Sequence, residues 1–163
     1  MRERGELPIR ATHNDTKINN VLFDEQSGKA VCVIDLDTVM PGLSAFDYGD
    51  AIRYGASTGA EDEPDLSKVW FDLDMFRAFT RGFLEACPSL TAAEKDALAL
   101  GAYTMTVECG IRFLTDYLEG DKYFAIEREN HNLDRCRTQF KLVSDMEKHW
   151  DEMLEIVREE SGR

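Results

Sequence analysis

The sequence predicts an α+β fold that is mostly helical, in which a small β-hairpin precedes a helical bundle. Two short apolar runs, 20–24 and 30–36, flank the turn-forming segment EQSGK, as the two arms of a hairpin do. From residue 67 onward the apolar residues recur at helical spacing. Strands and helices do not alternate along the chain, which argues against a doubly wound parallel sheet.

Length and composition indicate one unit of the soluble globular class. The chain has 163 residues, 43% hydrophobic and 31% charged, and we expect a single domain over 1–163 with a motif region at 12–50. The net charge of −13 argues against nucleic acid or an anionic membrane surface as a partner, because both require a basic face. No apolar run approaches the roughly 20 residues that span a bilayer.

The N-terminus and the cysteines favour a cytoplasmic protein. The opening residues, MRERGELPIR, contain no apolar stretch of the kind found in a signal peptide. The cysteines form no C-x-x-C pair and have no histidine at zinc-ligand spacing. We therefore expect all of them to be reduced, buried thiols. They are Cys32, Cys87, Cys109 and Cys136.

The first part of the chain is expected to contain short elements. Residues 9–12 are extended and lead to a strand at 20–24, and a second strand at 30–36 is expected to be buried because it is β-branched and nearly all apolar. A short helix follows at 46–56. The Gly-, Pro- and acid-rich stretch 57–66 is expected to be an exposed loop.

The helical region, 67–160, divides into three predicted helices. The first ends near Pro88. The second begins at Thr91, where T-A-A-E is a capping box, and stops before Gly120. The third spans about 123–160 as a long amphipathic helix that is kinked or split.

The stretch 13–37 carries the residues from which we predict chemistry. His13, Asp15 and Asn20 form the pattern H-x-D-x-x-x-x-N, and the second arm of the hairpin ends at Asp35. This is the layout of the catalytic loop, hairpin and metal-binding aspartate in kinase phosphoryl transfer. The hairpin would bring Asn20 and Asp35 to the same end of two paired strands, and His13 is expected to brace the loop.

Each of these residue types suits one part of that chemistry. Transfer to a hydroxyl needs a carboxylate beside the acceptor, a role for Asp15, and oxygen ligands for Mg²⁺. The amide oxygen of Asn20 and the carboxylate of Asp35 can supply those ligands. Asp37 would share a face with Asp35 if the strand continued. Lys17 could neutralise charge on the transferring phosphoryl group.

Two segments, HNDTKINNVLFD (13–24) and VIDLDTVMPGLSAFDYGDAIR (33–53), resemble C-lobe motifs of the aminoglycoside phosphotransferase and choline kinase superfamily. In character the chain is most similar to N-acetylhexosamine 1-kinase-type sugar kinases, which the segment 111–124 also resembles. The resemblance implies a protein-kinase-like C-terminal lobe, ATP and Mg²⁺ as cofactors, and a sugar hydroxyl as acceptor.

The resemblance also implies roles for single residues. Asp15 would be the catalytic base, Asn20 and Asp35 the magnesium ligands, and Asp47 the structural aspartate that ties the loops together. Many members have a histidine where this chain has Lys17, and a lysine there is closer to the protein-kinase loop. Lys17, Asn20 and Asp35 would thus contact the complex of ATP and Mg²⁺.

A complete enzyme of this type also has an N-lobe with a strand-borne lysine and a loop over the phosphates. The twelve residues before His13 are too few to build that lobe. We therefore expect a C-lobe that has no useful activity alone. The hydrophobic face where the N-lobe docks would favour a dimer.

A polar stripe on the second predicted helix is a candidate acceptor site. Thr104, Glu108, Arg112 and Asp116 are spaced four apart in an otherwise apolar segment. Arg112 and Asp116 could bind sugar hydroxyls. The same spacing also fits an intrahelical ladder of ion pairs, and the two interpretations are compatible.

Two other functions stay open. A metal-dependent phosphate hydrolase would hold two cations about 4 Å apart with Asp15, Asp35 and Asp37. A non-catalytic interaction module would bind a partner through the loop 57–66 and the last helix. Metal-dependent cleavage of a generic phosphate ester would favour the hydrolase. Failure to bind Mg²⁺ or nucleotide, even when a matching N-lobe is supplied in trans, would favour the interaction module.

Overall fold

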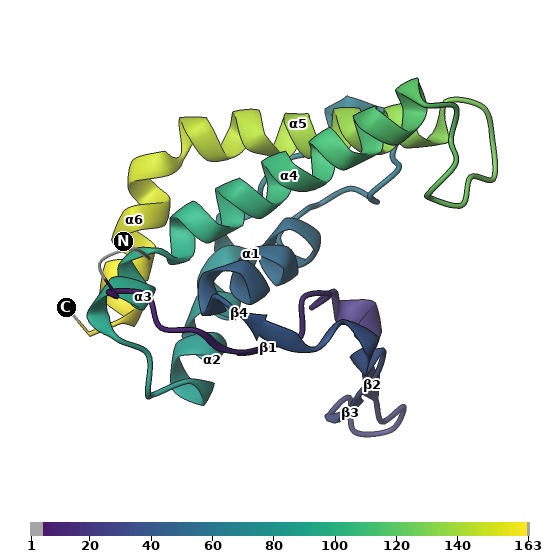
Figure 1. Cartoon of the computed structure of the whole chain (residues 1–163). Coiled ribbons are helices and arrows are strands. Elements are labelled where there is room, and N and C mark those ends of the chain that lie inside the picture. The colour runs from purple at the N-terminus through teal and green to yellow at the C-terminus, as the bar shows by residue number, and fades with distance from the viewer. Residues whose placement is uncertain (1–4, 163) are drawn as a thin grey trace.

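A computed structural model describes residues 5–162 of the chain. Six α-helices form most of this part, together with two small antiparallel sheets of two strands each. The predicted α+β class, mostly helical, is therefore confirmed (Figure 1). Within residues 5–162, no helix is long and apolar enough to cross a bilayer.

Two long helices, α4 (Leu98–Leu118) and α5 (His131–Lys148), lie side by side along the molecule, and α1 (Ser44–Gly55) packs against α4 (Figure 1). At one end α6 (Trp150–Glu160) packs against α2 (Leu73–Ala86). The short α3 (Ala92–Asp96) contacts both α4 and α6. The main hydrophobic core lies between these helices and includes Tyr48, Phe76, Leu98, Leu142 and Met153.

Helices α1 and α4 approach so closely that their backbones touch at two glycines. A Cβ on Gly101 would lie 2.1 Å from the carbonyl oxygen of Ala45, and a Cβ on Gly49 would lie 2.3 Å from that of Gly101. Real Cβ atoms do not come this close to a carbonyl. The two glycines therefore set the crossing of α1 and α4, and α1 is the helix that holds the motif region in place.

The strands form two separate ribbons. β1 (Arg10–Thr12) pairs with β4 (Met40–Gly42), with Thr12 opposite Met40. β2 (Val21–Phe23) pairs with β3 (Ala30–Val33), with Val21 opposite Val33. The β2–β3 hairpin projects away from the helical body (Figure 1). The predicted hairpin and the extended segment before it are thus confirmed.

The expectation of a buried strand over 30–36 is wrong in both length and burial. All four residues of β3 are exposed, because the projecting hairpin is covered by nothing in the described part of the chain. At Asp35 the backbone turns into the left-handed region, with φ of 60°, and a 3₁₀-helix η3 (Leu36–Thr38) follows. Asp37 therefore does not continue a strand face with Asp35. Cys32 on β3 is exposed too, contrary to expectation, while Cys109 and Cys136 are buried and all four thiols are free.

The predicted boundaries of the helices after residue 67 are partly wrong. The first predicted helix starts later, at α2, where the Asp72 carboxylate caps the first turn by accepting the amide hydrogens of Asp74 and Met75. The capping box at Thr91 is confirmed, but the helix breaks at Ala97 into α3 and α4. The last helical region is split, as expected, at His149.

That last region begins at α5 rather than near residue 123. The segment before it is a loop because the buried carboxylate of Asp116 accepts the amide hydrogens of Lys122, Tyr123 and Phe124, at 2.8–2.9 Å. These amides are therefore not available to a helix. A contact across only six to eight residues thus overrides the helical periodicity of the sequence.

Candidate active site

One helix, α1, holds the loop that carries the H-x-D motif. The Asp47 carboxylate accepts the backbone amide hydrogens of His13 and Asn14, both at 2.8 Å. One turn later the buried Asp50 carboxylate accepts the amide hydrogen of Thr16 at 2.7 Å. Three consecutive contacts from α1 therefore define the backbone on both sides of Asp15.

The His13 side chain links the loop to the end of β3. Its Nδ1 atom accepts the amide hydrogen of Asp15 at 3.3 Å, so the ring hydrogen is on Nε2. Nε2 lies 3.0 Å from the carbonyl oxygen of Ile34 and can donate to it. His13 thus spans the interval between the catalytic loop and Asp35.

The Asp15 carboxylate is half-buried and has two partners. Asn20 Nδ2 donates to Asp15 Oδ2 at 2.8 Å, and Lys17 Nζ lies 3.0 Å from Oδ1. Burial, the strongest single influence, raises the pKa of Asp15, but the hydrogen bonds from Lys17 and Asn20 together hold that pKa below its usual value. The group is therefore an ionised hydrogen-bond acceptor at neutral pH.

Asn20 and Asp35 come together at one end of the hairpin. The amide of Ile34 donates to the carbonyl oxygen of Asn20 at 2.9 Å, which places Asp35 directly after the residue bonded to Asn20. The side-chain nitrogen of Asn20 donates to Asp15, so Asn20 Oδ1 is the atom that remains available to a cation. The Asp35 carboxylate is exposed and does not cap η3.

An amide oxygen and a carboxylate suit Mg²⁺, which binds proteins through one or two carboxylates and takes its other ligands from water and phosphates. Across residues 5–162, no three His, Cys, Asp or Glu side chains gather as a closed metal site. Asn20 and Asp35 therefore fit a magnesium ion that takes its other ligands from phosphate and water. Asp37 does not belong to this pair, because the backbone turns at Asp35 into η3.

A cavity of about 420 Å³ opens beside Asp15, and we call it the catalytic-loop cavity. Asp15 and Lys17 line it from the loop, and Arg112 lines it from α4. The Arg112 guanidinium lies 3.7 Å from Glu108 and stacks 5.3 Å from the ring centre of Phe124. The volume is within the range of small-molecule sites.

Asp116, the other predicted substrate residue, does not line this cavity. Its carboxylate is buried and accepts the three loop amides described above as well as Asn132 Nδ2 at 2.9 Å. It therefore positions the loop that carries Tyr123 and Phe124, both of which line the cavity. Of the predicted ladder of ion pairs, the structure has the pair of Glu108 and Arg112. Asp116 does not join it, because its carboxylate accepts the amide hydrogens of the following loop.

A second, apolar cavity of about 350 Å³ lies on the other side of Asp15. Val33 from β3 and Phe79 and Phe83 from α2 contribute apolar walls, and Asn20 also lines it. The Asp15 carboxylate therefore stands between a polar cavity and an apolar one.

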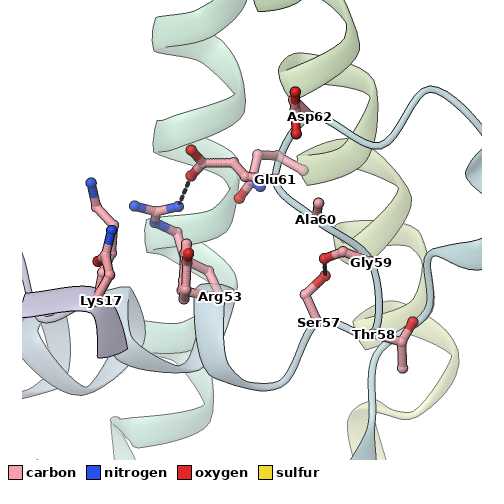
Figure 2. Close-up of a pocket in the computed structure, with 11 residues that line it drawn as sticks. Lys17, Arg53, Ser57, Thr58, Gly59, Ala60, Glu61 and Asp62 are labelled. Atoms are coloured by element: carbon pink, nitrogen blue, oxygen red, sulfur yellow. Dashed lines mark hydrogen bonds and ion pairs between the residues drawn. The ribbon is translucent and has the colours of Figure 1, made fainter. Parts of the chain in front are cut away.

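Some residues at the site were not anticipated from the sequence. Arg53 is buried and donates to Asp50 Oδ1 at 2.8 Å and to Glu61 Oε1 at 2.7 Å, as Figure 2 shows for Glu61. Glu61 and Arg135 also line the catalytic-loop cavity. No sequence signal connected Glu61, in the acidic loop, to Arg53.

The family comparison agrees with this geometry. Residues 1–81 match the model of the phosphotransferase enzyme family. The match supports the resemblance to the aminoglycoside phosphotransferase and choline kinase superfamily and a kinase-like phosphotransferase. It covers the catalytic loop, the hairpin and α1, whereas the α4 and α5 walls of the catalytic-loop cavity lie outside the matched residues. The phosphotransferase match thus bears on the loop that carries Asp15 and on the hairpin, and the structure alone describes the α4 and α5 side of the cavity.

Proposed function

We propose that this chain is the catalytic, acceptor-binding lobe of an ATP- and Mg²⁺-dependent phosphotransferase that acts on a sugar hydroxyl. The observation that carries the proposal is the Asp15 carboxylate, held by Asn20 and Lys17 at the wall of the catalytic-loop cavity. The phosphotransferase family match supports the reaction class.

Asp15 accepts the hydrogen bond of the acceptor hydroxyl and orients its oxygen toward the phosphoryl donor. A base with a lowered pKa is a weak proton acceptor, which is sufficient for a loose phosphoryl-transfer transition state that needs positioning more than full deprotonation. Lys17, already 3.0 Å from Asp15, places a positive charge where the transferring group approaches. The Asp15 carboxylate should stay ionised as the pH falls from 7 to about 5, because its pKa lies below the usual value.

Asn20 and Asp35 would hold the magnesium ion, and a bound ion would neutralise charge on the phosphates of ATP. The contact between Ile34 and Asn20 keeps the two ligands adjacent without any contribution from ATP. Asp47 stabilises this arrangement by accepting the backbone amide hydrogen of His13, and the His13 ring stabilises it by contacting the carbonyl oxygen of Ile34 after β3.

A direct test of the metal site uses Mn²⁺ as a paramagnetic probe in NMR spectra of the chain. We expect broadening centred on the amides of Asn20 and Asp35, and its loss in Asp35→Ala. Broadening that is unchanged by Asp35→Ala would contradict the assignment. Asp151→Ala, in the exposed first turn of α6, is the matched control.

The test of the reaction is ATP-dependent phosphorylation of N-acetylglucosamine. We expect no useful turnover by the chain alone, and turnover when it is fused to the nucleotide-binding lobe of a characterised phosphotransferase. In the active fusion Asp15→Asn should lower kcat by roughly 10²–10⁴. An Asp15→Asn fusion as active as the wild type would refute the role of Asp15, and turnover by the chain alone would refute the proposed inactivity.

The hydrolase alternative receives less support from the geometry. Asp37 sits in η3 with its backbone turned away from the strand direction of Asp35, so the two carboxylates and Asp15 do not form a cluster of three within residues 5–162. Mg²⁺-dependent cleavage of p-nitrophenyl phosphate by the chain would restore that alternative.

We further propose that the nucleotide-binding lobe covers the exposed apolar side chains around the hairpin, and that the chain dimerises through them where nothing covers them. These side chains are each about half exposed or more and lie on β2, β3, η3 and β4. They are Leu22, Phe23, Val31, Val33, Leu36 and Met40. Leu22 pairs with Cys32, so it lies on the other face of the hairpin from Val31 and Val33. Exposed apolar side chains on neighbouring elements are typical of interaction sites. Sedimentation of a strict monomer at millimolar concentration would contradict the dimer.

A further inference from the structure

Cationic side chains from four different segments line the catalytic-loop cavity. Among residues 5–162 they are Lys17 from the catalytic loop, Arg53 from α1, Arg112 from α4 and Arg135 from α5. The chain as a whole is acidic, with 32 aspartates and glutamates against 19 lysines and arginines. An anion can approach such a chain only where cations are left without carboxylate partners. The partners of these four side chains therefore decide whether the cavity can bind an anion.

Two of the four cations have close carboxylate partners. Lys17 Nζ lies 3.0 Å from Asp15, at the end of the cavity where the proposed transfer takes place. Arg53 is buried and donates to Asp50 and to Glu61, and Figure 2 shows its contact with Glu61. One positive charge thus lies between two negative charges. The side of the cavity that is formed by the catalytic loop and α1 therefore has no excess of positive charge.

The two arginines from α4 and α5 lack such close partners. Arg112 lies 3.7 Å from Glu108, and both side chains are nearly half exposed, so this ion pair is weak. Arg135 has no carboxylate partner among residues 5–162. Its Nη1 donates to the carbonyl oxygen of Ala125 at 3.1 Å and to Asn132 Oδ1 at 3.0 Å, and both acceptors are uncharged. The lining side chains from α4 and α5 therefore carry a net positive charge.

Aromatic rings hold both guanidinium groups in place. Arg112 lies 5.3 Å from the ring centre of Phe124, and Arg135 lies 5.6 Å from that of Phe113. The two rings pack against each other, with their centres 4.7 Å apart. A stacked guanidinium keeps the donors at its edge for a ligand, and fixing it before binding lowers the entropic cost of binding. The two arginines therefore form one preorganised cationic wall, which we call the arginine wall.

The arginine wall does not face the proposed magnesium site. Neither Asn20 nor Asp35, the proposed magnesium ligands, lines the catalytic-loop cavity. The phosphates of ATP accompany the magnesium ion. They are therefore not the expected partner of Arg112 and Arg135, and an anion bound there belongs to the acceptor.

We propose that the arginine wall binds an anionic group of the acceptor, so that the substrate is a sugar that carries a carboxylate or a phosphate. The anion lies against Arg112 and Arg135, and a hydroxyl of the same molecule reaches Asp15. Guanidinium groups bind carboxylates and phosphates through two parallel charge-assisted hydrogen bonds, which a sugar hydroxyl cannot accept. The position of the hydroxyl at Asp15 rests on the proposed function, whereas the anion site does not.

The first test is titration of the chain, without nucleotide, with glucose, glucuronate, glucose 6-phosphate and glucosamine, followed by NMR. We expect at least one of the two anionic sugars to bind about tenfold more tightly than glucose, because a charge-assisted hydrogen bond is roughly twice as strong as a neutral one. Glucosamine, which is cationic, should bind no more tightly than glucose. The anionic sugar should shift the Nε–Hε signals of Arg112 and Arg135, and its affinity should fall as salt is added. Tighter binding of glucuronate identifies a carboxylate as the anion, and tighter binding of glucose 6-phosphate identifies a phosphate.

The second test compares charge-removing variants by the ratio of the affinity for the anionic sugar to the affinity for glucose. Arg112→Gln and Arg135→Gln should each lower this ratio from about ten to about one to three, because one charged partner is lost. Arg135→Lys keeps the charge without the planar fork and should retain part of the ratio. The matched control Arg158→Gln, in the exposed part of α6, should leave the ratio as it is in the wild type.

The proposal is overturned if neither anionic sugar binds more tightly than glucose, or if the preference persists in both glutamine variants. Inorganic phosphate that binds as tightly as glucose 6-phosphate would also overturn it, because the arginine wall would then not recognise a sugar. If a glutamine variant fails to fold, the Nε–Hε signals of the wild type decide. A failure of phosphoryl transfer in the fusion would leave these binding results intact, and a fusion that prefers glucose to both anionic sugars would refute the anion site alone.

Discussion

Asp47 is the residue whose removal tests most directly how the catalytic loop is held. Its two carboxylate oxygens accept the amide hydrogens of His13 and Asn14, each at 2.8 Å. Asp47→Ala removes both acceptors and leaves both amide hydrogens without a partner. The backbone of α1 remains helical, because alanine has the highest helix propensity.

The size of the effect follows from these two contacts. A hydrogen bond to a charged group contributes about 1.5–3 kcal/mol, so two such bonds set an upper limit of roughly 6 kcal/mol. His13 is half-buried and Asn14 is exposed, so water can replace part of the loss. We therefore expect Asp47→Ala to lower the free energy of unfolding by about 2–4 kcal/mol, within the 5–15 kcal/mol that a typical domain has.

Urea denaturation followed by circular dichroism measures this loss, and hydrogen exchange of the amides of His13 and Asn14 locates it. Asp37→Ala removes the same charge from the exposed η3 and should change the free energy by no more than about 0.5 kcal/mol. The reasoning is refuted if the two variants are equally stable, or if the two amides exchange as slowly in Asp47→Ala as in the wild type.

Four further substitutions probe the acid stability, the helix crossing, the helix propensity of α2 and the proposed acceptor side. The hydrogen bond from Arg10 lowers the pKa of Glu94 from 4.5 to about 2, so this carboxylate stabilises the fold above about pH 4.5 and the contribution is lost as the pH falls toward 2. The wild type should lose about 2–3 kcal/mol more than Glu94→Gln over that window, and equal acid sensitivity of the two would contradict the assignment. Gly101→Ala places a Cβ 2.1 Å from a carbonyl oxygen of α1 and should destabilise by about 2–4 kcal/mol in the same denaturation assay. In Gly82→Ala the new Cβ has no neighbouring atom within 4 Å, so the better helix propensity of alanine should raise the free energy of unfolding by about 0.5–1 kcal/mol. A lower free energy of unfolding in this variant would contradict that explanation. In an active fusion, Arg112→Ala should raise the KM for sugar about tenfold with kcat little changed, because it lines the cavity beside Asp15, and unchanged kinetics would rule out that contact.

Local features were predictable because they depend on neighbouring residues alone. The hairpin follows from turn chemistry at 24–28, where the amide and hydroxyl of Ser27 donate to Asp24 and Gly28 has a φ of +66°. The capping box at Thr91 is a contact between residues three apart. The spacing H-x-D-x-x-x-x-N likewise needs only a short loop to bring Asn20 against Asp15.

Burial was not predictable in the same way. The apolar β-branched sequence of β3 is typical of a covered strand, yet every residue in it is exposed. Asp116 has the spacing of an ion-pair ladder on α4, yet it is buried and organises the following loop. For β3 the outcome depends on which other segments lie nearby, and for Asp116 it depends on how the chain turns six to eight residues later. Helical or strand periodicity carries no information about either.

The sequence by itself determined the loop H-x-D-x-x-x-x-N, the hairpin that follows it and most of the helices, because turn, cap and periodicity signals act over a few residues. Only the tertiary structure decided the proposed acceptor side. The catalytic-loop cavity brings residues of the loop 13–17 and of α1 together with residues of α4 and α5, and the pair of Arg53 with Glu61 fastens the segment 57–62 to α1. Asp15 is therefore recognisable from its own neighbours in the chain, whereas the cavities on which its proposed substrate depends exist only after the helices have packed.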